Sequence, residues 1–107
     1  MVSDWNEKNL KREIKSKNTL LVNFWAPWCV HCKLMNPVFE KISEEFKGKI
    51  KCGRINSKEN PKIAEEFHVF GIPTVIIFKE GKEKGRIIGF DTEEELRNKI
   101  EKIVNLS

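Results

Sequence analysis

The chain has 107 residues, of which 39% are hydrophobic and 34% are charged. A chain of this length can bury a core without metal or disulfide staples, and its short apolar blocks exclude disorder, so residues 1–107 are expected to form a single domain. The formal net charge of +4 arises from 20 basic and 16 acidic residues that are interspersed, which argues against nucleic-acid binding.

The first half of the chain is predicted to contain two helices with a buried strand between them. Ser3 or Asp4 is expected to cap a helix that runs to about Lys17. Residues 20–25 are almost continuously apolar, which is typical of a strand that is buried on both faces of a sheet. The apolar residues within 29–46 follow helical spacing, so this segment is predicted to be the second helix.

The second half is predicted to contain three strands and two helices. In chain order these are a strand at 50–56, a short helix from Pro61 to about His68, strands at 74–79 and 84–88, and a helix that begins in the acidic run 91–95. Together the elements form a βαβ unit followed by a ββα unit. Because the crossover between parallel strands is right-handed, we expect an α/β fold with helices on both faces of the sheet.

No segment of the sequence predicts insertion into a membrane. The first twenty residues lack the apolar core of a secretory signal, and no apolar run approaches the roughly 18 residues of a membrane span. We therefore expect a soluble, monomeric protein of the cytoplasm.

Two of the three cysteines, Cys29 and Cys32, form a Cys-x-x-Cys run. This odd count argues against a structural disulfide framework and favours a catalytic or metal-binding pair. The spacing places two thiols one helical turn apart, close enough to bridge. At the start of a helix the macrodipole favours a thiolate, and the pKa of such a thiol falls from about 8.5 to roughly 3.5–7.5. We therefore expect Cys29 to attack a disulfide and Cys32 to resolve the mixed disulfide.

Two other residues, His31 and Cys52, each have a functional and a structural interpretation. A cationic His31 would stabilise the Cys29 thiolate and make the couple more oxidising by roughly 30 mV for each pK unit, and the alternative is an exposed spacer residue. Cys52 lies in a predicted strand, where a small apolar core residue is the favoured interpretation over a regulatory thiol. His68 is interpreted as structural.

A metal centre is the main alternative from another class of site. Cys29, His31, Cys32 and Cys52 are residue types that bind zinc, but a structural zinc site normally pairs two ligand knuckles, and only one is present. The haem-attachment pattern also fails, because Lys33 and not histidine follows Cys32. We expect neither a metal nor a bound cofactor, since dithiol exchange needs none.

Several landmarks at matching separations resemble the thioredoxin family across roughly residues 20–106. They are the run Phe24-Trp25-Ala26-Pro27-Trp28-Cys29-Val30-His31-Cys32-Lys33, then Pro37, Gly71-Ile72-Pro73-Thr74, Phe78-Lys79-Glu80-Gly81 and Gly89. The resemblance implies a thioredoxin fold, in which helices flank both faces of a central mixed β-sheet. The family's first strand should be short or absent, because only Met1 and Val2 precede the first predicted helix cap.

The resemblance also implies how protein substrates are held. Pro73 would be the cis-proline beside the disulfide, and Ile72 would offer main-chain hydrogen bonds to an extended substrate. The shallow apolar platform that receives partner polypeptides would consist of Trp28, Ile72, Pro73, Gly89 and Phe90. Core packing is the alternative for Trp28. The implied partners are disulfide-containing proteins, with a flavoprotein reductase or another dithiol upstream.

The sequence departs from the family pattern at two places. Asn23 stands where a buried aspartate is usual, and Arg54 stands near it in place of a lysine. Asn23 can orient a water or hydrogen-bond to Cys32, but it cannot act as a general base, so we expect a slower resolving step. Val30-His31 replaces the usual Gly-Pro and resembles disulfide isomerases and oxidases. We expect a cytoplasmic disulfide reductase and electron carrier, with oxidase or isomerase activity, or a non-catalytic binding module, as alternatives.

Overall fold

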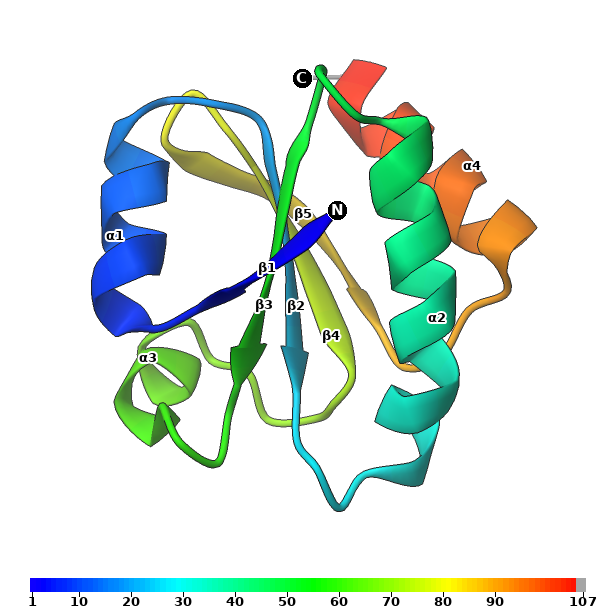
Figure 1. The fold of residues 1–107 in the computed structure, drawn as a ribbon. Coiled ribbons are helices and arrows are strands. Elements are labelled where there is room, and N and C mark those ends of the chain that lie inside the picture. The colour runs from blue at the N-terminus through cyan, green and yellow to red at the C-terminus, as the bar shows by residue number, and fades with distance from the viewer. Residues whose placement is uncertain (106–107) are drawn as a thin grey trace.

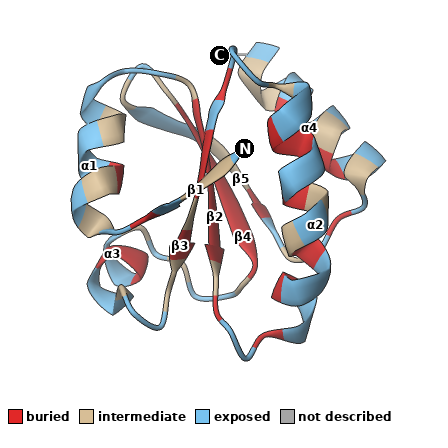
Figure 2. Ribbon diagram, viewed as in Figure 1, coloured by how far each residue is buried: buried red, intermediate tan, exposed pale blue. Residues whose placement is uncertain are grey.

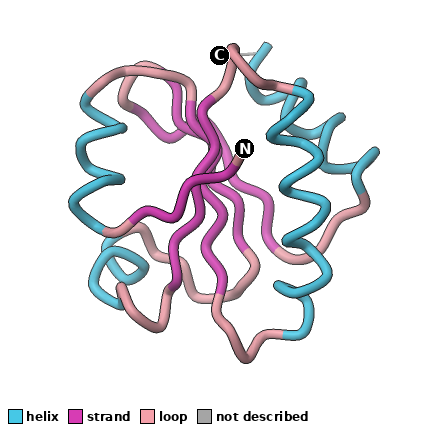
Figure 3. Tube along the Cα trace, in the orientation of Figure 1, coloured by secondary structure: helices cyan, strands magenta, loops and turns pink. Residues whose placement is uncertain are grey.

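A computed structural model describes residues 1–105 and shows one sheet between two layers of helices (Figures 1 and 3). In chain order its elements are β1 (Val2–Trp5), α1 (Glu7–Lys15), β2 (Leu20–Trp25), α2 (Val30–Glu45), β3 (Lys51–Asn56), α3 (Pro61–Glu66), β4 (Thr74–Lys79), β5 (Lys82–Ile88) and α4 (Glu93–Asn105). None of the helices in this part of the chain combines the length and the apolar character needed to cross a membrane.

The sheet is mixed, with the strand order β1-β3-β2-β4-β5. Strands β1, β3 and β2 run parallel to one another, whereas β4 is antiparallel to both β2 and β5. Helices α2 and α4 cover one face of the sheet, and α1 and α3 cover the other (Figure 1). This arrangement confirms the predicted α/β fold with a central mixed sheet and helices on both faces.

The start of the chain differs from the prediction of a helix capped by Ser3 or Asp4. Residues Val2–Trp5 instead form the short strand β1, and the cap of α1 is Asn6. The Asn6 side chain accepts a hydrogen bond from the Asn9 N–H at 2.8 Å, and the Asn9 side chain accepts one from the Asn6 N–H at 3.1 Å. Several residues here are good helix caps, and pairing with β3, which is distant in the sequence, decides which of them is used.

The remaining elements occur where the sequence predicts them, with ends that coincide or shift by one or two residues. A capping box marks the start of α4, within the acidic run where the sequence predicts it: the Thr92 hydroxyl accepts from the Glu95 N–H at 3.2 Å, and the Glu95 carboxylate accepts from the Thr92 N–H at 2.9 Å. The hydrogen bond from the Thr92 N–H lowers the pKa of Glu95, because it favours the ionised carboxylate.

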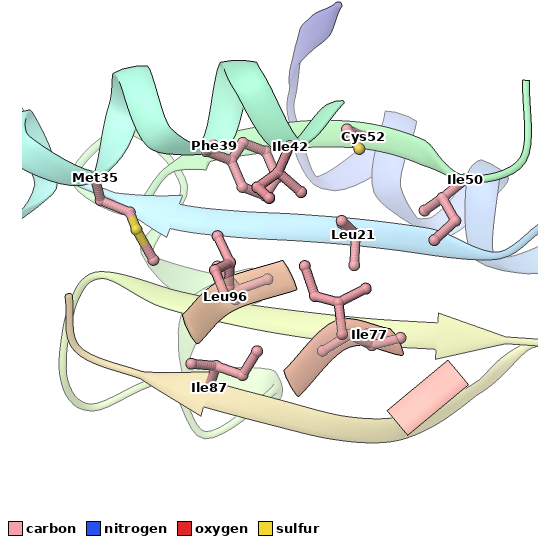
Figure 4. Close-up of a cluster of buried hydrophobic side chains, with 11 residues drawn as sticks. Leu21, Met35, Phe39, Ile42, Ile50, Cys52, Ile77, Ile87 and Leu96 are labelled. Atoms are coloured by element: carbon pink, nitrogen blue, oxygen red, sulfur yellow. The ribbon is translucent and has the colours of Figure 1, made fainter. Parts of the chain in front are cut away.

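Buried residues concentrate in β2, β4 and the inner sides of the helices (Figure 2). The cluster on the α2 and α4 face is drawn in Figure 4 and includes Leu21, Met35, Phe39, Ile42, Ile77 and Leu96. The cluster on the opposite face includes Trp5, Leu10, Leu20, Val22, Phe24 and Ile63. Both faces of β2 are therefore buried, which explains why its sequence is apolar at nearly every position.

Candidate active site

Cys29 and Cys32 lie where the chain passes from β2 to α2. Residues 26–28 connect the strand to Cys29, which is the N-cap residue of the helix. The two sulfurs are joined by a disulfide, and the Cα atoms are 5.2 Å apart. Cys29 keeps 7% of its surface exposed, whereas Cys32 is fully buried. The Cys29 sulfur is thus nearer the solvent, and the Cys32 sulfur lies deeper in the protein.

The local electrostatics around Cys29 favour negative charge on its sulfur. The Cys32 N–H donates to Cys29 Sγ at 3.1 Å, as it would to the side chain of any N-cap residue. No acidic residue lies in the first turn of α2, and its exposed side chains include the basic residues His31 and Lys33. The helix macrodipole adds positive potential at the same end, so an ionised sulfur is stabilised there.

A second segment, Ile72-Pro73, faces the cysteines from the start of β4. The peptide bond between these two residues is cis, as the family resemblance implies. The carbonyl oxygen of Ile72 lies 3.8 Å from Cys29 Sγ, and the Ile72 side chain packs against the buried cluster that contains both cysteines. The Gly89 N–H donates to the Pro73 carbonyl oxygen at 2.8 Å, so a third segment is tied to the same place.

Two of the apolar residues expected to receive a substrate, Trp28 and Phe90, are at the surface. Trp28 is 68% exposed and Phe90 is 40% exposed, whereas Trp5 is buried in the core. The core-packing alternative for Trp28 is therefore wrong. Ile72 is partly buried and Pro73 is buried, so Trp28 and Phe90 supply the most exposed apolar side chains of the expected platform.

Asn23 lies in β2 on the sheet face that α2 covers. Side chains alternate along a strand, and Asn23 shares its face with Leu21, which packs beneath α2 and α4. Asn23 is fully buried, and neither its Oδ1 nor its Nδ2 atom has a hydrogen-bond partner among residues 1–105. A buried amide without partners destabilises a protein by about 1–3 kcal/mol, so packing alone does not explain this residue.

Arg54 stands directly opposite Asn23 in the β2–β3 register but is directed elsewhere. Its Nε atom forms an ion pair with Asp4 on β1, and its guanidinium carbon lies 5.4 Å from the centre of the Trp25 ring. The Trp25 side chain in turn packs against the cluster of Ala26, Cys29 and Cys32. The charge of Arg54 is therefore balanced by a carboxylate at the sheet edge, and not at position 23.

The third cysteine, Cys52, is separate from this site. It lies in β3 within the core cluster of Figure 4 and is 4% exposed. Burial raises the pKa of its thiol to about 12, so it is neutral and unreactive at physiological pH. Across residues 1–105, no three histidine, cysteine or acidic side chains are grouped so as to hold a metal ion.

Cys52→Val is expected to reduce the loss of stability at alkaline pH. Because the folded-state pKa of about 12 lies above the ordinary value of 9.0, the folded protein keeps a proton that the unfolded chain releases. This contribution is complete below the ordinary value, and it decreases by roughly 1.4 kcal/mol per pH unit as the pH rises toward the folded value. Urea unfolding at pH 7 and pH 10 measures the difference.

The comparison is cleanest in a Cys29→Ser, Cys32→Ser background, where no disulfide can form within the chain. The chain has no tyrosine, so no phenol titrates in the same pH range. If that background loses the same stability at pH 10 with and without the Cys52→Val substitution, burial of this thiol does not control alkaline stability.

Known proteins resemble the chain over nearly its whole length. A family model described as Thioredoxin matches residues 1–102. The chain is 38% identical over 102 residues to Thioredoxin M-type, chloroplastic, of Pisum sativum, covering 95% of this chain and 57% of that protein. It is 37% identical over 105 residues to Thioredoxin of Rickettsia felis, covering 97% of this chain and 100% of that protein.

The same similarity extends to an algal protein, Thioredoxin of Pyropia yezoensis, with 37% identity over 97% of this chain and 98% of that protein. The chain spans only about half the length of some plant relatives, 51% for Thioredoxin M4, chloroplastic, of Arabidopsis thaliana. The match covers the whole sheet, the disulfide and the Ile72-Pro73 segment. The chain therefore belongs to the thioredoxin family.

Proposed function

We propose that the chain is a cytoplasmic disulfide reductase that carries electrons to disulfide-containing proteins. The observation that supports this most directly is the position of Cys29 Sγ at the N-terminus of the 16-residue helix α2, where it accepts the Cys32 N–H at 3.1 Å. A helix end of this kind stabilises a thiolate, which is the nucleophile of disulfide exchange.

In the proposed reaction the reduced protein begins with a thiolate at Cys29. This sulfur attacks one sulfur of a substrate disulfide, the substrate S–S bond breaks, and the departing substrate thiolate takes a proton from water. The Cys32 sulfur, after losing its proton, then attacks Cys29 in the mixed disulfide and releases the second substrate thiol. Two electrons pass to the substrate, and Cys29–Cys32 closes into the disulfide of this structure. An upstream dithiol or flavoprotein reductase would restore the dithiol.

The surrounding residues have supporting roles in the proposal. Ile72 lies beside Cys29 Sγ and would pair its main chain with an extended substrate segment. Trp28 and Phe90 would contact apolar side chains of that segment. Pro73 and Gly89, which are hydrogen-bonded to each other, would keep the segment close to the disulfide. His31, exposed in the first turn of α2, would make the couple more oxidising when it is protonated.

Reduction of insulin by the protein, with dithiothreitol as the electron source, tests the proposed activity. Turnover is expected for the parent and not for Cys29→Ser. The reduction potential of the Cys29–Cys32 couple then distinguishes the direction of use. A potential near the cytosolic glutathione poise or below it favours a reductase, and a much higher one favours the oxidase or isomerase activity that Val30-His31 suggests. Partner capture without turnover would indicate a binding module.

The cytoplasmic location is a separate part of the proposal. The names of several plant and algal relatives place those proteins in the chloroplast, whereas the name of the Rickettsia felis protein specifies no compartment. Fractionation of the source cells with an antibody against the chain would decide the location. Sedimentation of the purified protein would test the proposed monomeric state.

Asn23→Asp is expected to accelerate the resolving step at least about tenfold at neutral pH. A carboxylate at this buried position can accept the proton of the Cys32 thiol, which the asparagine amide cannot do. The step is measured by loading Cys29 with thionitrobenzoate and following its release by Cys32 in stopped flow. An unchanged rate in the Asn23→Asp protein would rule out proton transfer at this position as the limiting event.

Asn23→Leu is the matched control, because it removes the amide without supplying a base, and it should be no faster than the parent. The Asn23→Asp protein should also be less stable to urea at pH 7 than at pH 5. Burial raises the folded-state pKa of a carboxyl group without a cationic partner, so its ionisation opposes folding as the pH rises.

A further inference from the structure

Exposed apolar side chains of large size occur on the chain segments that adjoin the disulfide and the Ile72-Pro73 segment. Among residues 1–105 and apart from Met1, they are Trp28, Val30, Leu34, Phe70, Ile88 and Phe90. They come from three neighbouring chain segments: the start of α2, the turn before Pro73, which reaches Cys29 through Ile72, and the end of β5, which Gly89 ties to Pro73. Clustered exposed apolar residues mark interaction surfaces, whereas single scattered ones do not.

Two of these residues, Phe70 and Ile88, extend beyond the expected platform. Phe70 is 85% exposed and Ile88 is 70% exposed, the largest fractions in the group. Ile88 pairs with Thr74 in the β4–β5 ladder, and a Cβ at Gly71 would lie 3.9 Å from its Cγ2 atom. Since β4 lies between β2 and β5, Ile88 is on the opposite side of the Pro73 segment from the cysteine loop.

The turn that carries Phe70 is held in place by Arg86 on β5. The Arg86 guanidinium donates to the carbonyl oxygen of Phe67 at 2.9 Å and to that of His68 at 3.2 Å. The Glu83 carboxylate accepts two hydrogen bonds from the same guanidinium, at 2.7 and 2.8 Å. The Phe70 ring is therefore presented to solvent by an anchored turn, which lowers the entropy lost when a partner binds.

The charged side chains next to Phe70 favour neither a positively nor a negatively charged partner. The shallow hollow at its side is lined by Lys62, Glu65, Glu66 and His68, which combine basic and acidic groups. The feature that distinguishes this place is the apolar ring itself, together with Ile88. An apolar side chain of the substrate is thus the complementary group.

We propose that Phe70 and Ile88 form a specificity subsite that receives a bulky apolar side chain of the substrate polypeptide, a few residues from the disulfide under attack. The proposal rests on the proposed function, because the substrate reaches this subsite only when its disulfide segment lies along Ile72-Pro73 beside Cys29. The preferred substrates are extended protein segments with an apolar residue near the cysteine, and small disulfides gain nothing from the subsite.

The test compares three disulfides as substrates of the parent, Phe70→Ser and Phe70→Leu. Two are synthetic peptides with one internal disulfide and either leucine or serine within four positions on both sides of the cysteines; the third is bis(2-hydroxyethyl) disulfide. Phe70→Ser should lower kcat/KM for the leucine peptide by about three- to tenfold through KM, because less apolar surface is buried. The serine peptide and bis(2-hydroxyethyl) disulfide should react as they do with the parent.

Phe70→Leu keeps an apolar side chain and should retain most of the preference for the leucine peptide. Equal effects of Phe70→Ser on all three substrates, or no effect on any of them, would overturn the subsite. If the parent fails to reduce even bis(2-hydroxyethyl) disulfide, the proposed function itself is wrong. The thermal unfolding of Phe70→Ser should match that of the parent, since the side chain is 85% exposed.

Discussion

Cys32→Ser is expected to abolish turnover and to leave substrate proteins covalently attached to Cys29. The Cys29 sulfur can still attack a substrate disulfide, because it lies at the surface end of the pair and its helix N-cap position is unchanged. Serine oxygen cannot displace the substrate from the mixed disulfide, so the second step stops. Insulin reduction should fall to the uncatalysed background, and non-reducing electrophoresis with mass spectrometry should show an adduct at Cys29.

The matched control is Cys29→Ser, which keeps the buried Cys32 thiol but removes the accessible one. We expect no turnover and no adduct, because Cys32 is fully buried. Cys52 should capture nothing in either variant, since burial raises the pKa of its thiol to about 12. Adducts at Cys32 or Cys52 in place of Cys29 would contradict the assigned order of attack.

Gly53→Ala is expected to produce the largest loss of stability, about 3–5 kcal/mol, by displacing Trp5 from the core. A Cβ built on Gly53 of β3 would overlap the Trp5 indole and lie 2.5 Å from its Cζ3 atom. Trp5 is 8% exposed and packs in the cluster beneath α1. Either the ring leaves this cluster or β1 separates from β3, and both outcomes expose a large apolar surface. Urea unfolding measures the loss.

A double-mutant cycle isolates the cause of that loss. Trp5→Ala removes the obstructing ring, so Gly53→Ala should be nearly neutral in that background, and the two changes should be strongly non-additive. Gly71→Ala is the control for a glycine substitution without a steric conflict, because its Cβ would meet only Ile88 at 3.9 Å, and its effect should be within about 0.5 kcal/mol. Additive effects in the cycle would show that contact with Trp5 is not the reason for glycine at position 53.

Local sequence signals were sufficient for the elements that form the frame of the site. The β-branched run Thr74–Lys79 predicts β4 with the same boundaries as the structure, and the Thr92–Glu95 capping box marks the start of α4. The Cys29–Cys32 spacing between an apolar strand and an amphipathic helix likewise predicts the strand–helix junction. Each of these signals depends on residues that are close together in the chain.

Strand β1 and the directions of polar side chains depend on distant partners. Val2–Trp5 becomes a strand because β3 offers it a parallel edge, and no short-range pattern reveals that pairing. Similarly, the family resemblance implies that Arg54 stands near Asn23, and the two residues are opposite each other in the β2–β3 register. The Arg54 guanidinium nevertheless pairs with Asp4, and the Asn23 amide has no partner among residues 1–105. Strands β1, β3 and β2 lie side by side here, and their register determines which charged side chains can pair.

The amino-acid sequence by itself determined the α/β class, most of the helices and strands, and the pairing of Cys29 with Cys32, because these depend on local periodicity, capping and spacing. Only the tertiary structure decided which apolar residues face solvent: Phe70 and Ile88 read as ordinary hydrophobic residues until the β4–β5 pairing and the Arg86 hydrogen bonds fix the turn before Pro73 next to the end of β5. Exposure is a property of the packed chain, since it depends on what other segments cover.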